Sequence, residues 1–426
     1  MVRNSNVISP GFYWFMQCLI KIRNQHIFFI LSLFTLGVDP FPGIPLNLSQ
    51  WIVLLWFLYQ SLFTKKIIGI YLILFNVALF WGSIILYYHN FDFEMLKKLI
   101  GIFIYSFTLY NYVYHYRYKL QEVISFYLFA CIIISIIAIV QEIGWFIKIS
   151  WLYDFSYLNI TNPLTPMGKL FRATSITSEP AHLAYMLFPG FFLSVLSILG
   201  INKLVLIKKY QILIIVTAMI FSFSLVGYFS MIICLIYYII SSSFNKGKKI
   251  LLVGLLTLLF VTIIKNENIF DRIKLMQTET FAITSNTKSQ WALISNAYVA
   301  YSSLINNPLG TGIQTHQLNY NKYISGIYSL GEFNVNTEDA NSLYLRLISE
   351  FGIFGICAII SFYLFFKIKD STKSPYRVLN TLALFFLFIY SIRMGGYLNP
   401  LFWFFVNITI VTKWYCKRLT FPQLQS

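Results

Sequence analysis

Long apolar runs, separated by short polar segments, dominate the pattern of this chain. A helix needs about 20 predominantly apolar residues to cross the hydrocarbon core of a bilayer. On that basis the pattern predicts about twelve spans. The expected spans are 25–37, 47–63, 67–88, 97–115, 121–147, 181–200, 210–225, 227–244, 250–264, 341–366, 377–392 and 398–414. We therefore expect an all-α fold, a polytopic transmembrane helical bundle that forms one integral membrane domain over residues 1–426.

Two polar segments are much longer than the other connections. They cover residues 148–180 and 265–340, whereas helix connections in bundles usually have about 2–8 residues. The second is the largest non-spanning piece and comes just before the tenth expected span. Within it, residues 292–304 predict a helix that lies on the membrane surface. A shorter break near Gly227 predicts that spans 210–225 and 227–244 form a hairpin.

The composition agrees with a membrane protein. Of the 426 residues, 58% are hydrophobic and only 11% are charged, and the mean hydropathy is +0.69. Soluble domains have about 25% charged residues. The five cysteines have no spacing typical of a metal site or a disulfide framework.

The net charge of +17 indicates a nucleic-acid partner only if the charge is spread over one soluble surface. Here most Lys and Arg residues fall in short loops on one side of the expected membrane, such as those at Lys65, Lys208 and Lys246. Among the acidic residues, only Glu122 and Asp370 fall on that side. By the positive-inside rule this side is cytoplasmic. We expect both termini inside, the two long segments outside and no nucleic acid as partner.

The most informative stretch runs from Pro308 to Gly355. It opens with Pro308 to Gly312, which predicts a tight turn, and closes as a polar entry into an apolar helix. In that entry Ser342, Arg346 and Glu350 recur at every fourth residue and share one helix face. Charged residues at the mouth of a span are candidates for a functional site. The alternative interpretation is that Arg346 and Glu350 pair only with each other and fix helix packing.

A second candidate site lies at the end of the first long segment. Pro180 suits the first turn of the following helix. Glu179 and His182 are three residues apart and can face the same side as an acid–base pair, and Arg172 has the planar fork that suits an anion. The alternative interpretation is a helix cap with a polar interfacial histidine. No Walker, Rossmann, HExxH, CxxC or DxD-type pattern occurs in a fitting context, so the sequence predicts no metal and no cofactor.

Three segments together resemble the O-antigen polymerase and ligase family, the Wzy-like membrane glycosyltransferases of bacterial surface polysaccharide. Residues 172–185 are similar to the family's Arg-led segment before a helix. Residues 291–312 resemble its segment of Trp, Pro and Gly-x-Gly, and residues 341–355 resemble its segment that begins with Asn and ends in Glu-x-Gly-x-x-Gly. The ligase-like pattern has His just before that Asn. Here the position is Ala340, which favours a polymerase.

The resemblance implies glycosyl transfer between oligosaccharides linked to polyprenyl pyrophosphate, on the outer face of the bacterial cytoplasmic membrane. The product would be O-antigen, capsule or exopolysaccharide. Its implied partners are these lipid-linked oligosaccharides, membrane lipids and a chain-length regulator. Such a reaction needs cations for the departing pyrophosphate and a base near the acceptor hydroxyl. The candidates for substrate binding are Arg172, Lys288, Asn341 and Arg346, and those for acid–base catalysis are Glu179, His182, His316, Glu338 and Asp339.

Two other functions are compatible with the sequence. One is a ligase-type transferase, which Ala340 counts against. The other is a transporter or flippase of lipid-linked sugars. Transporters usually have inverted repeats and charges deep in their spans, whereas here the polar residues gather in the outer segments.

The charge asymmetry predicts the orientation of the chain. Cysteines substituted for Ser156 and Ser325 are expected to react with an impermeant maleimide in intact spheroplasts, because both positions lie in the outer segments. A cysteine at Ser243 is expected to stay unlabelled. Labelling at Ser243, with none at the other two positions, would reverse the orientation.

Overall fold

The computed structural model of the chain describes residues 24–35, 38, 48–63, 93–156, 166–167, 170–200, 204–241, 246–265, 288–330, 337–368 and 375–416. Over these residues the fold is helical, apart from one two-residue antiparallel strand pair, β1 (Pro166–Met167) and β2 (Leu170–Phe171). The helices are α2 (Asn24–Phe34), α3 (Leu48–Phe63), α5 (Phe93–His115), α6 (Leu120–Phe146), α7 (Ser150–Tyr153), α8 (Pro180–Ile198), α9 (Lys209–Phe221), α10 (Leu225–Ser241), α11 (Lys246–Lys265), α13 (Lys288–Asn306), α14 (His316–Tyr323), the 3₁₀ helix η2 (Ile324–Leu330), α15 (Leu343–Phe366), α16 (Pro375–Arg393) and α17 (Pro400–Cys416). The expected all-α class is confirmed.

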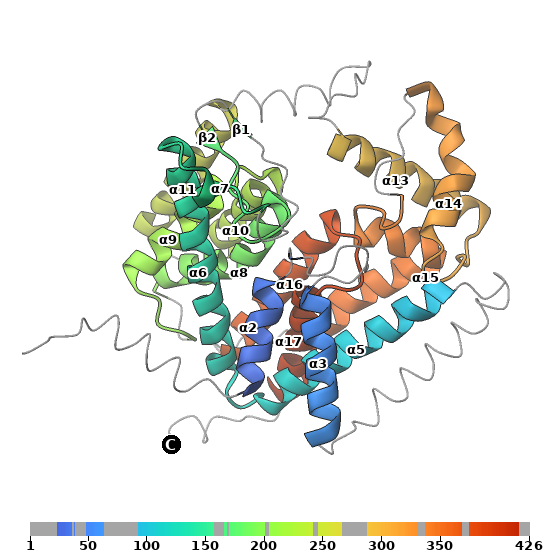
Figure 1. Cartoon of the computed structure of the whole chain (residues 1–426), viewed down its shortest axis with the longest axis horizontal. Coiled ribbons are helices and arrows are strands. Elements are labelled where there is room, and N and C mark those ends of the chain that lie inside the picture. Colours follow the sequence, from blue (N-terminus) through green and yellow to red (C-terminus); the bar gives the residue numbers. More distant parts are fainter. Residues whose placement is uncertain are drawn as a thin grey trace, which may run out of the picture.

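Helices α16 and α17 lie at the centre of the molecule (Figure 1). Helices α6 to α11 gather on one side of them, and α13, α14 and α15 on the other. The core is rich in aromatic rings. Phe404 of α17 packs against Phe29 of α2, with ring centroids 4.6 Å apart, and against Tyr127 of α6 at 5.9 Å. Offset and tilted ring pairs of this kind stabilise a core beyond the burial of their area.

Four helices are long and apolar enough to cross a membrane: Leu120–Phe146, Pro180–Ile198, Leu343–Phe366 and Pro375–Arg393. Shorter apolar helices lie at four more of the expected spans, over Gln25–Phe34, Lys209–Phe221, Leu225–Ile240 and Lys249–Val261. The expected span 67–88 lies outside the described residues. The expected break between the spans 210–225 and 227–244 is present, because α9 ends at Phe221 and α10 begins at Leu225.

Helix α15 is sharply bent rather than continuous. Its Gly352 has φ 57° and ψ −131°, a non-helical conformation that is open only to glycine. A Cβ atom at Gly355 would overlap the carbonyl oxygen of Leu347, and the hydroxyls of Tyr344 and Tyr363 are 2.7 Å apart. In a straight helix, positions 19 residues apart would be about 28 Å from each other. The expected tenth span is therefore two helices that meet at a sharp angle.

The turn at residues 308–312 closes around this bend. The backbone N–H groups of Thr311 and Gly312 donate to the carbonyl oxygen of Glu350 at 2.9 and 2.7 Å, and the N–H of Ile353 donates to the carbonyl oxygen of Pro308 at 2.8 Å. These three bonds satisfy backbone groups that the break would otherwise leave without partners. We call this arrangement of residues 308–312 and 350–353 the backbone clasp. The tight turn expected in this stretch is confirmed by a separate bond, from the N–H of Gly310 to the carbonyl oxygen of Asn307 at 2.9 Å.

The clasp predicts that Gly352→Ala destabilises the protein by about 3 kcal/mol or more. The new Cβ would overlap the Pro308 carbonyl oxygen, and alanine does not tolerate this backbone conformation. The melting temperature and yield of detergent-extracted protein measure the effect. Gly254→Ala is the matched control, because Gly254 lies inside α11 with nothing within 4 Å of its added Cβ. Equal melting temperatures for the two variants would contradict the prediction.

Candidate functional site

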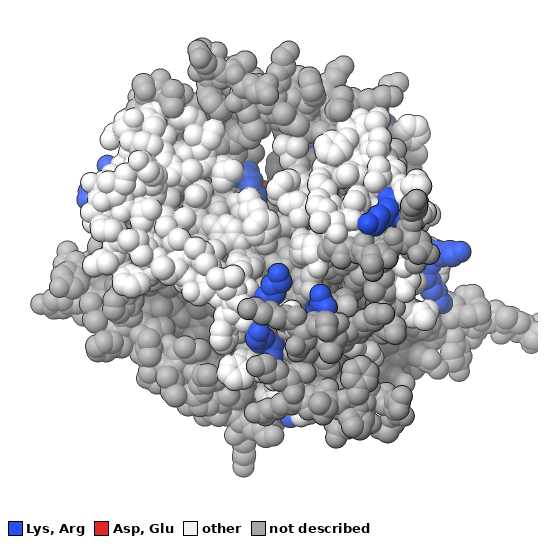
Figure 2. Space-filling view, turned by 180° about the vertical axis from the view of Figure 1, so that it is seen from behind, with Lys and Arg blue, Asp and Glu red and all other residues white. Residues whose placement is uncertain are grey.

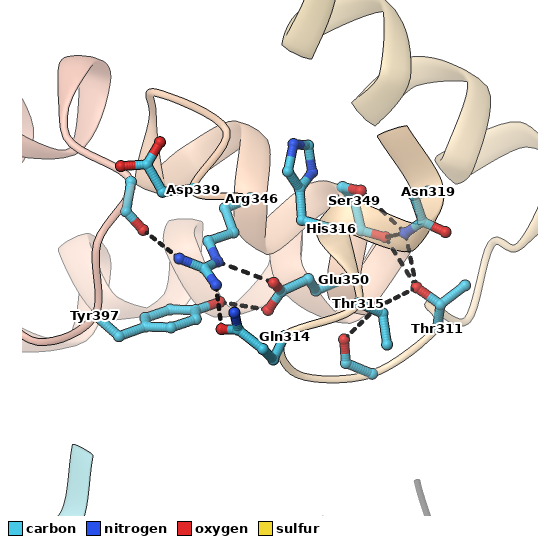
Figure 3. A network of polar contacts seen from close by, with 12 residues as sticks. Thr311, Gln314, Thr315, His316, Asn319, Asp339, Arg346, Ser349, Glu350 and Tyr397 are labelled. Carbon is cyan, nitrogen blue, oxygen red and sulfur yellow. Dashed lines mark hydrogen bonds and ion pairs between the residues drawn. The ribbon is translucent and has the colours of Figure 1, made fainter. Parts of the chain in front are cut away.

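The ion pair of Arg346 and Glu350 lies directly beside the backbone clasp (Figure 3). Arg346 Nε donates to Glu350 Oε1 at 2.9 Å, and the two side chains are 2% and 0% exposed. The remaining guanidinium nitrogens are also occupied: Nη1 donates to the carbonyl oxygen of Gly395 at 3.0 Å, and Nη2 donates to Gln314 Oε1. Arg346 therefore joins three separate parts of the chain, as an arginine can because its donors point in fixed directions.

Tyr397 completes this polar group. Its hydroxyl donates to Glu350 Oε2 at 2.6 Å, and its ring lies under the Arg346 guanidinium, 4.2 Å from the centroid. Burial and, next, the charge of Glu350 raise the pKa of Tyr397 well above its usual value, so the hydroxyl keeps its proton. Every oxygen of Glu350 has a donor, as a buried charge requires. Arg346 and Glu350 do share a face, and the geometry favours the interpretation that they fix packing. Binding of pyrophosphate by Arg346 stays a prediction.

A second polar group ties the clasp to helices α13 and α14. Asn319 Nδ2 donates to the Ser349 carbonyl oxygen at 3.0 Å and to Thr311 Oγ1 at 2.8 Å. Ser303 Oγ donates to the same Ser349 carbonyl at 2.8 Å. Two helices of the long polar segment are thereby fixed to α15, next to its bend.

His316 is fully buried at the start of α14. Its Nε2 lies 2.8 Å from Asn296 Oδ1. Because Asn296 Nδ2 already donates to the Ala292 carbonyl oxygen, Oδ1 is the acceptor and Nε2 carries the proton. His316 Nδ1 is buried and has no hydrogen-bond partner. Burial and, next, the charge of Arg346 lower the pKa of His316 to about 3. This environment favours a structural, neutral histidine over the expected acid–base role.

The structure brings three of the predicted site residues together at the other candidate site. Glu179 precedes α8, His182 lies in its first turn, and Asp339 comes from the turn before α15. Both carboxylates interact electrostatically with His182 and with Arg393, the last residue of α16. His182 is partly exposed, and its Nδ1 lies 2.8 Å from Ser178 Oγ. We call Glu179, His182, Asp339 and Arg393 the acid–base cluster.

Packing between three elements holds this cluster in place. The rings of Tyr185 in α8 and Tyr390 in α16 are 5.4 Å apart. Ser342 Oγ donates to the Ser391 carbonyl oxygen at 2.9 Å, and a Cβ atom at Gly395 would overlap the Asp339 carbonyl. The start of α8, the turn at 337–342 and the end of α16 therefore meet at one point.

Arg172 lies in a loop between the end of α6 and helix α10. The loop that carries it is fixed to the end of α6: Gln141 Oε1 accepts from Ser175 N at 2.6 Å, and Glu142 Oε2 accepts from Phe171 N at 3.1 Å. Arg172 is partly buried and interacts electrostatically with Tyr228 of α10. An anion clamp formed by Arg172 together with Glu179 and His182 stays a prediction.

The other predicted residues have varied environments. Glu338 is exposed, whereas Asn341 is buried with φ 51° and its N–H donates to Asp339 Oδ1 at 3.0 Å. Lys288 begins α13, but its side chain lies outside the described residues. Among the described residues, no group of three or more His, Cys, Asp or Glu side chains could hold a metal ion.

Sequence reasoning did not identify Arg393, Gln314 or Tyr397 as site residues. Arg393 stands alone at the end of a span, where arginine usually marks the interface. The surface view shows Lys or Arg atoms, with a trace of acidic atoms, deep in a hollow between the two sides of the molecule (Figure 2). Basic side chains are thus present inside the molecule as well as on its rim.

Comparison with known proteins gave no match: no family model, no curated protein and no solved structure matches this chain.

The environment of His316 predicts how stability depends on pH. The unfolded histidine has a pKa near 6.5, above the folded value of about 3, so the unfolded state takes up the proton first as the pH falls. The contribution is therefore fully present above about pH 6.5 and is lost towards pH 3, by about 1.4 kcal/mol per pH unit. Melting temperatures between pH 7 and pH 5 should fall less steeply for His316→Asn than for the wild type.

His115→Asn is the control for this experiment, because His115 is exposed at the end of α5. It should keep the pH dependence of the wild type. An unchanged slope in His316→Asn would show that His316 takes up no proton on unfolding.

Proposed function

We propose that this protein is a Wzy-like membrane glycosyltransferase that polymerises oligosaccharide repeats carried on polyprenyl pyrophosphate. The observation that supports the proposal is the acid–base cluster, in which a partly exposed histidine and an arginine interact electrostatically with the same two carboxylates. The resemblance of residues 172–185 and 341–355 to this family supports it, because the first segment supplies Glu179 and His182 and the second begins two residues after Asp339.

The cluster suits transfer to a sugar hydroxyl. In the proposed step, the acceptor oxygen attacks the anomeric carbon of the donor sugar, and the bond from that carbon to the phosphate oxygen breaks. The acceptor proton passes to Nε2 of His182, and the donor lipid leaves as polyprenyl pyrophosphate. Nearby carboxylates would stabilise the imidazolium that forms. The hydrogen bond to Ser178 fixes the orientation of the ring.

His182 is the best supported of the five candidate bases. His316 is fully buried and held neutral, and Glu338 is exposed in the turn before α15. Glu179 and Asp339 both act on His182, which suits a supporting role. A well-placed general base contributes about 10²- to 10⁴-fold to a rate.

The proposal includes an arrangement in the membrane. We infer about twelve membrane segments with both termini cytoplasmic, from the apolar runs and the positive-inside rule. The tenth of these segments is the bent helix α15. The start of α8 and the end of α16 would then lie at the outer face of the bacterial cytoplasmic membrane. A lipid-linked substrate would reach the cluster from the outer leaflet.

A flippase of lipid-linked sugars is the second candidate, and one observation favours it. Discontinuous helices with buried charges are typical of secondary transporters, and α15 is broken next to the buried pair of Arg346 and Glu350. Against it, the break is closed by the backbone clasp. In transporters the unwound backbone groups are instead open to substrate or ions.

Deletion of the gene distinguishes these functions. Cells without a polymerase should accumulate single lipid-linked repeats on the outer side, whereas cells without a flippase should keep them inside. In complemented cells, His182→Gln should reduce polymer about 100-fold at matched protein level, because it removes the base. His316→Asn, the control, should retain polymer at matched protein level. Normal polymer from His182→Gln would exclude His182 as the base, and polymer in the deletion strain would contradict the polymerase.

A further inference from the structure

Three buried polar atoms next to the acid–base cluster have no hydrogen-bond partner. They are the hydroxyls of Tyr185 and Tyr390 and the Nη1 atom of Arg393. The two tyrosines are 2% and 1% exposed. Buried polar groups nearly always have partners, so each exception calls for an explanation such as a bound molecule.

The residues that carry these atoms are neighbours. Tyr185 and Tyr390 are in ring contact at 5.4 Å. His182 is three residues before Tyr185, and Arg393 is three residues after Tyr390, so each lies about one helical turn away. The two helices meet with the start of α8 beside the end of α16, and both turns therefore point to the same end of the pair. Arg393 interacts electrostatically with Tyr185, which agrees with this placement.

The charges around these atoms argue against an anion as their partner. Glu179 and Asp339 each bring a negative charge, and Arg393 brings one positive charge. Even with His182 protonated, the surroundings are only neutral. A pyrophosphate would be repelled by the two carboxylates. A neutral molecule with many hydroxyls is not, and each of its hydroxyls can both donate and accept.

Arg346 differs from Arg393, because each nitrogen of its guanidinium already has a partner in the protein. Its guanidinium donates to Glu350, to Gly395 and to Gln314. Arg393 forms no ion pair within 4 Å with either carboxylate, and its Nη1 is without a partner. Of these two arginines, Arg393 is the one with a buried donor that has no partner in the protein.

We propose that Tyr185, Tyr390 and Arg393 form the subsite that binds hydroxyl groups of the acceptor sugar, beside His182. This inference rests on the proposed glycosyl transfer. It assigns the sugar to the acid–base cluster and requires that the pyrophosphate of the donor binds elsewhere. The two tyrosine hydroxyls and the Arg393 donor would orient the acceptor so that one hydroxyl faces His182 Nε2.

The test uses the purified full chain in lipid nanodiscs and two probes. One probe is the lipid-linked single repeat extracted from cells in which the gene is deleted. The other is polyprenyl pyrophosphate without sugar. The variants are Tyr185→Phe, Tyr390→Phe and the double variant, which keep the ring packing and remove only the hydroxyls.

We expect the double variant to bind the sugar-bearing lipid about tenfold more weakly, because it loses about two hydrogen bonds to the sugar. Its affinity for the lipid without sugar should be unchanged. Without ligand, its melting temperature should be equal to that of the wild type or higher, because removal of an unpartnered buried hydroxyl carries no loss of a hydrogen bond. A purely structural role for the hydroxyls would instead lower the melting temperature.

Tyr127→Phe is the matched control. Tyr127 is also buried, but its hydroxyl donates to the Met186 carbonyl oxygen at 2.6 Å. Removal of the Tyr127 hydroxyl should lower the melting temperature and leave the binding of both probes unchanged.

Each remaining result overturns the inference. Equal weakening for both probes would show that the hydroxyls bind the pyrophosphate or support the fold. Unchanged binding of both probes by the double variant would show that the unpartnered atoms hold only water, while the proposed function would stand. If the wild type binds neither probe, the proposed function is wrong and the acceptor subsite with it.

Discussion

The carbonyl group of Glu350 is the point on which much of this structure depends. A helix that breaks inside a membrane protein leaves backbone groups without partners, and no water is present in the hydrocarbon region to satisfy them. In α15 the break at Gly352 is closed by N–H groups of Thr311 and Gly312, which come from a segment almost 40 residues earlier. The side chain of the same Glu350 then binds Arg346 and Tyr397. One residue thus connects the long polar segment, the bent helix and the loop between α16 and α17.

The backbone clasp also gives a physical meaning to two of the three segments that resemble the glycosyltransferase family. The glycines of the Gly-x-Gly segment and of Glu-x-Gly-x-x-Gly lie where two backbones meet. Gly310 and Gly352 have positive φ, and a side chain on either would collide with the facing backbone. Their spacing therefore indicates an architecture and says little about chemistry. The chemistry of the proposal rests on the third segment, through Glu179 and His182, together with Asp339.

Much of the helical organisation could be predicted from the sequence, because it depends on local pattern. Spacing alone predicts the break between α9 and α10, the helix over 292–304, and the shared face of Arg346 and Glu350. The bend in α15 could not be predicted in this way, since a glycine inside an apolar run is also compatible with a straight span.

The candidate sites could be predicted less well than the helices, because they depend on contacts between segments that are far apart in the sequence. His316 resembled a catalytic base in the sequence, but its partner Asn296 and the charge of Arg346 depend on tertiary structure. Arg393 had the appearance of an interfacial anchor until α8 and α16 were seen to meet at Tyr185 and Tyr390.

The two polar groups of the molecule differ in one respect that bears on function. Around Arg346 and Glu350 the charged atoms have protein partners, and a saturated buried network is rigid because each member holds the next. Around His182 three buried atoms have none. A protein that leaves donors and acceptors unpaired loses stability there, and such losses persist at sites where a ligand supplies the missing partners. Asp339 stands between the groups, since it acts on both Arg346 and Arg393. The group around Arg346 and Glu350 can therefore hold the group around His182 in position. On this view the backbone clasp and its ion pair support the structure, and the end of the bundle where α8 meets α16 binds the ligand.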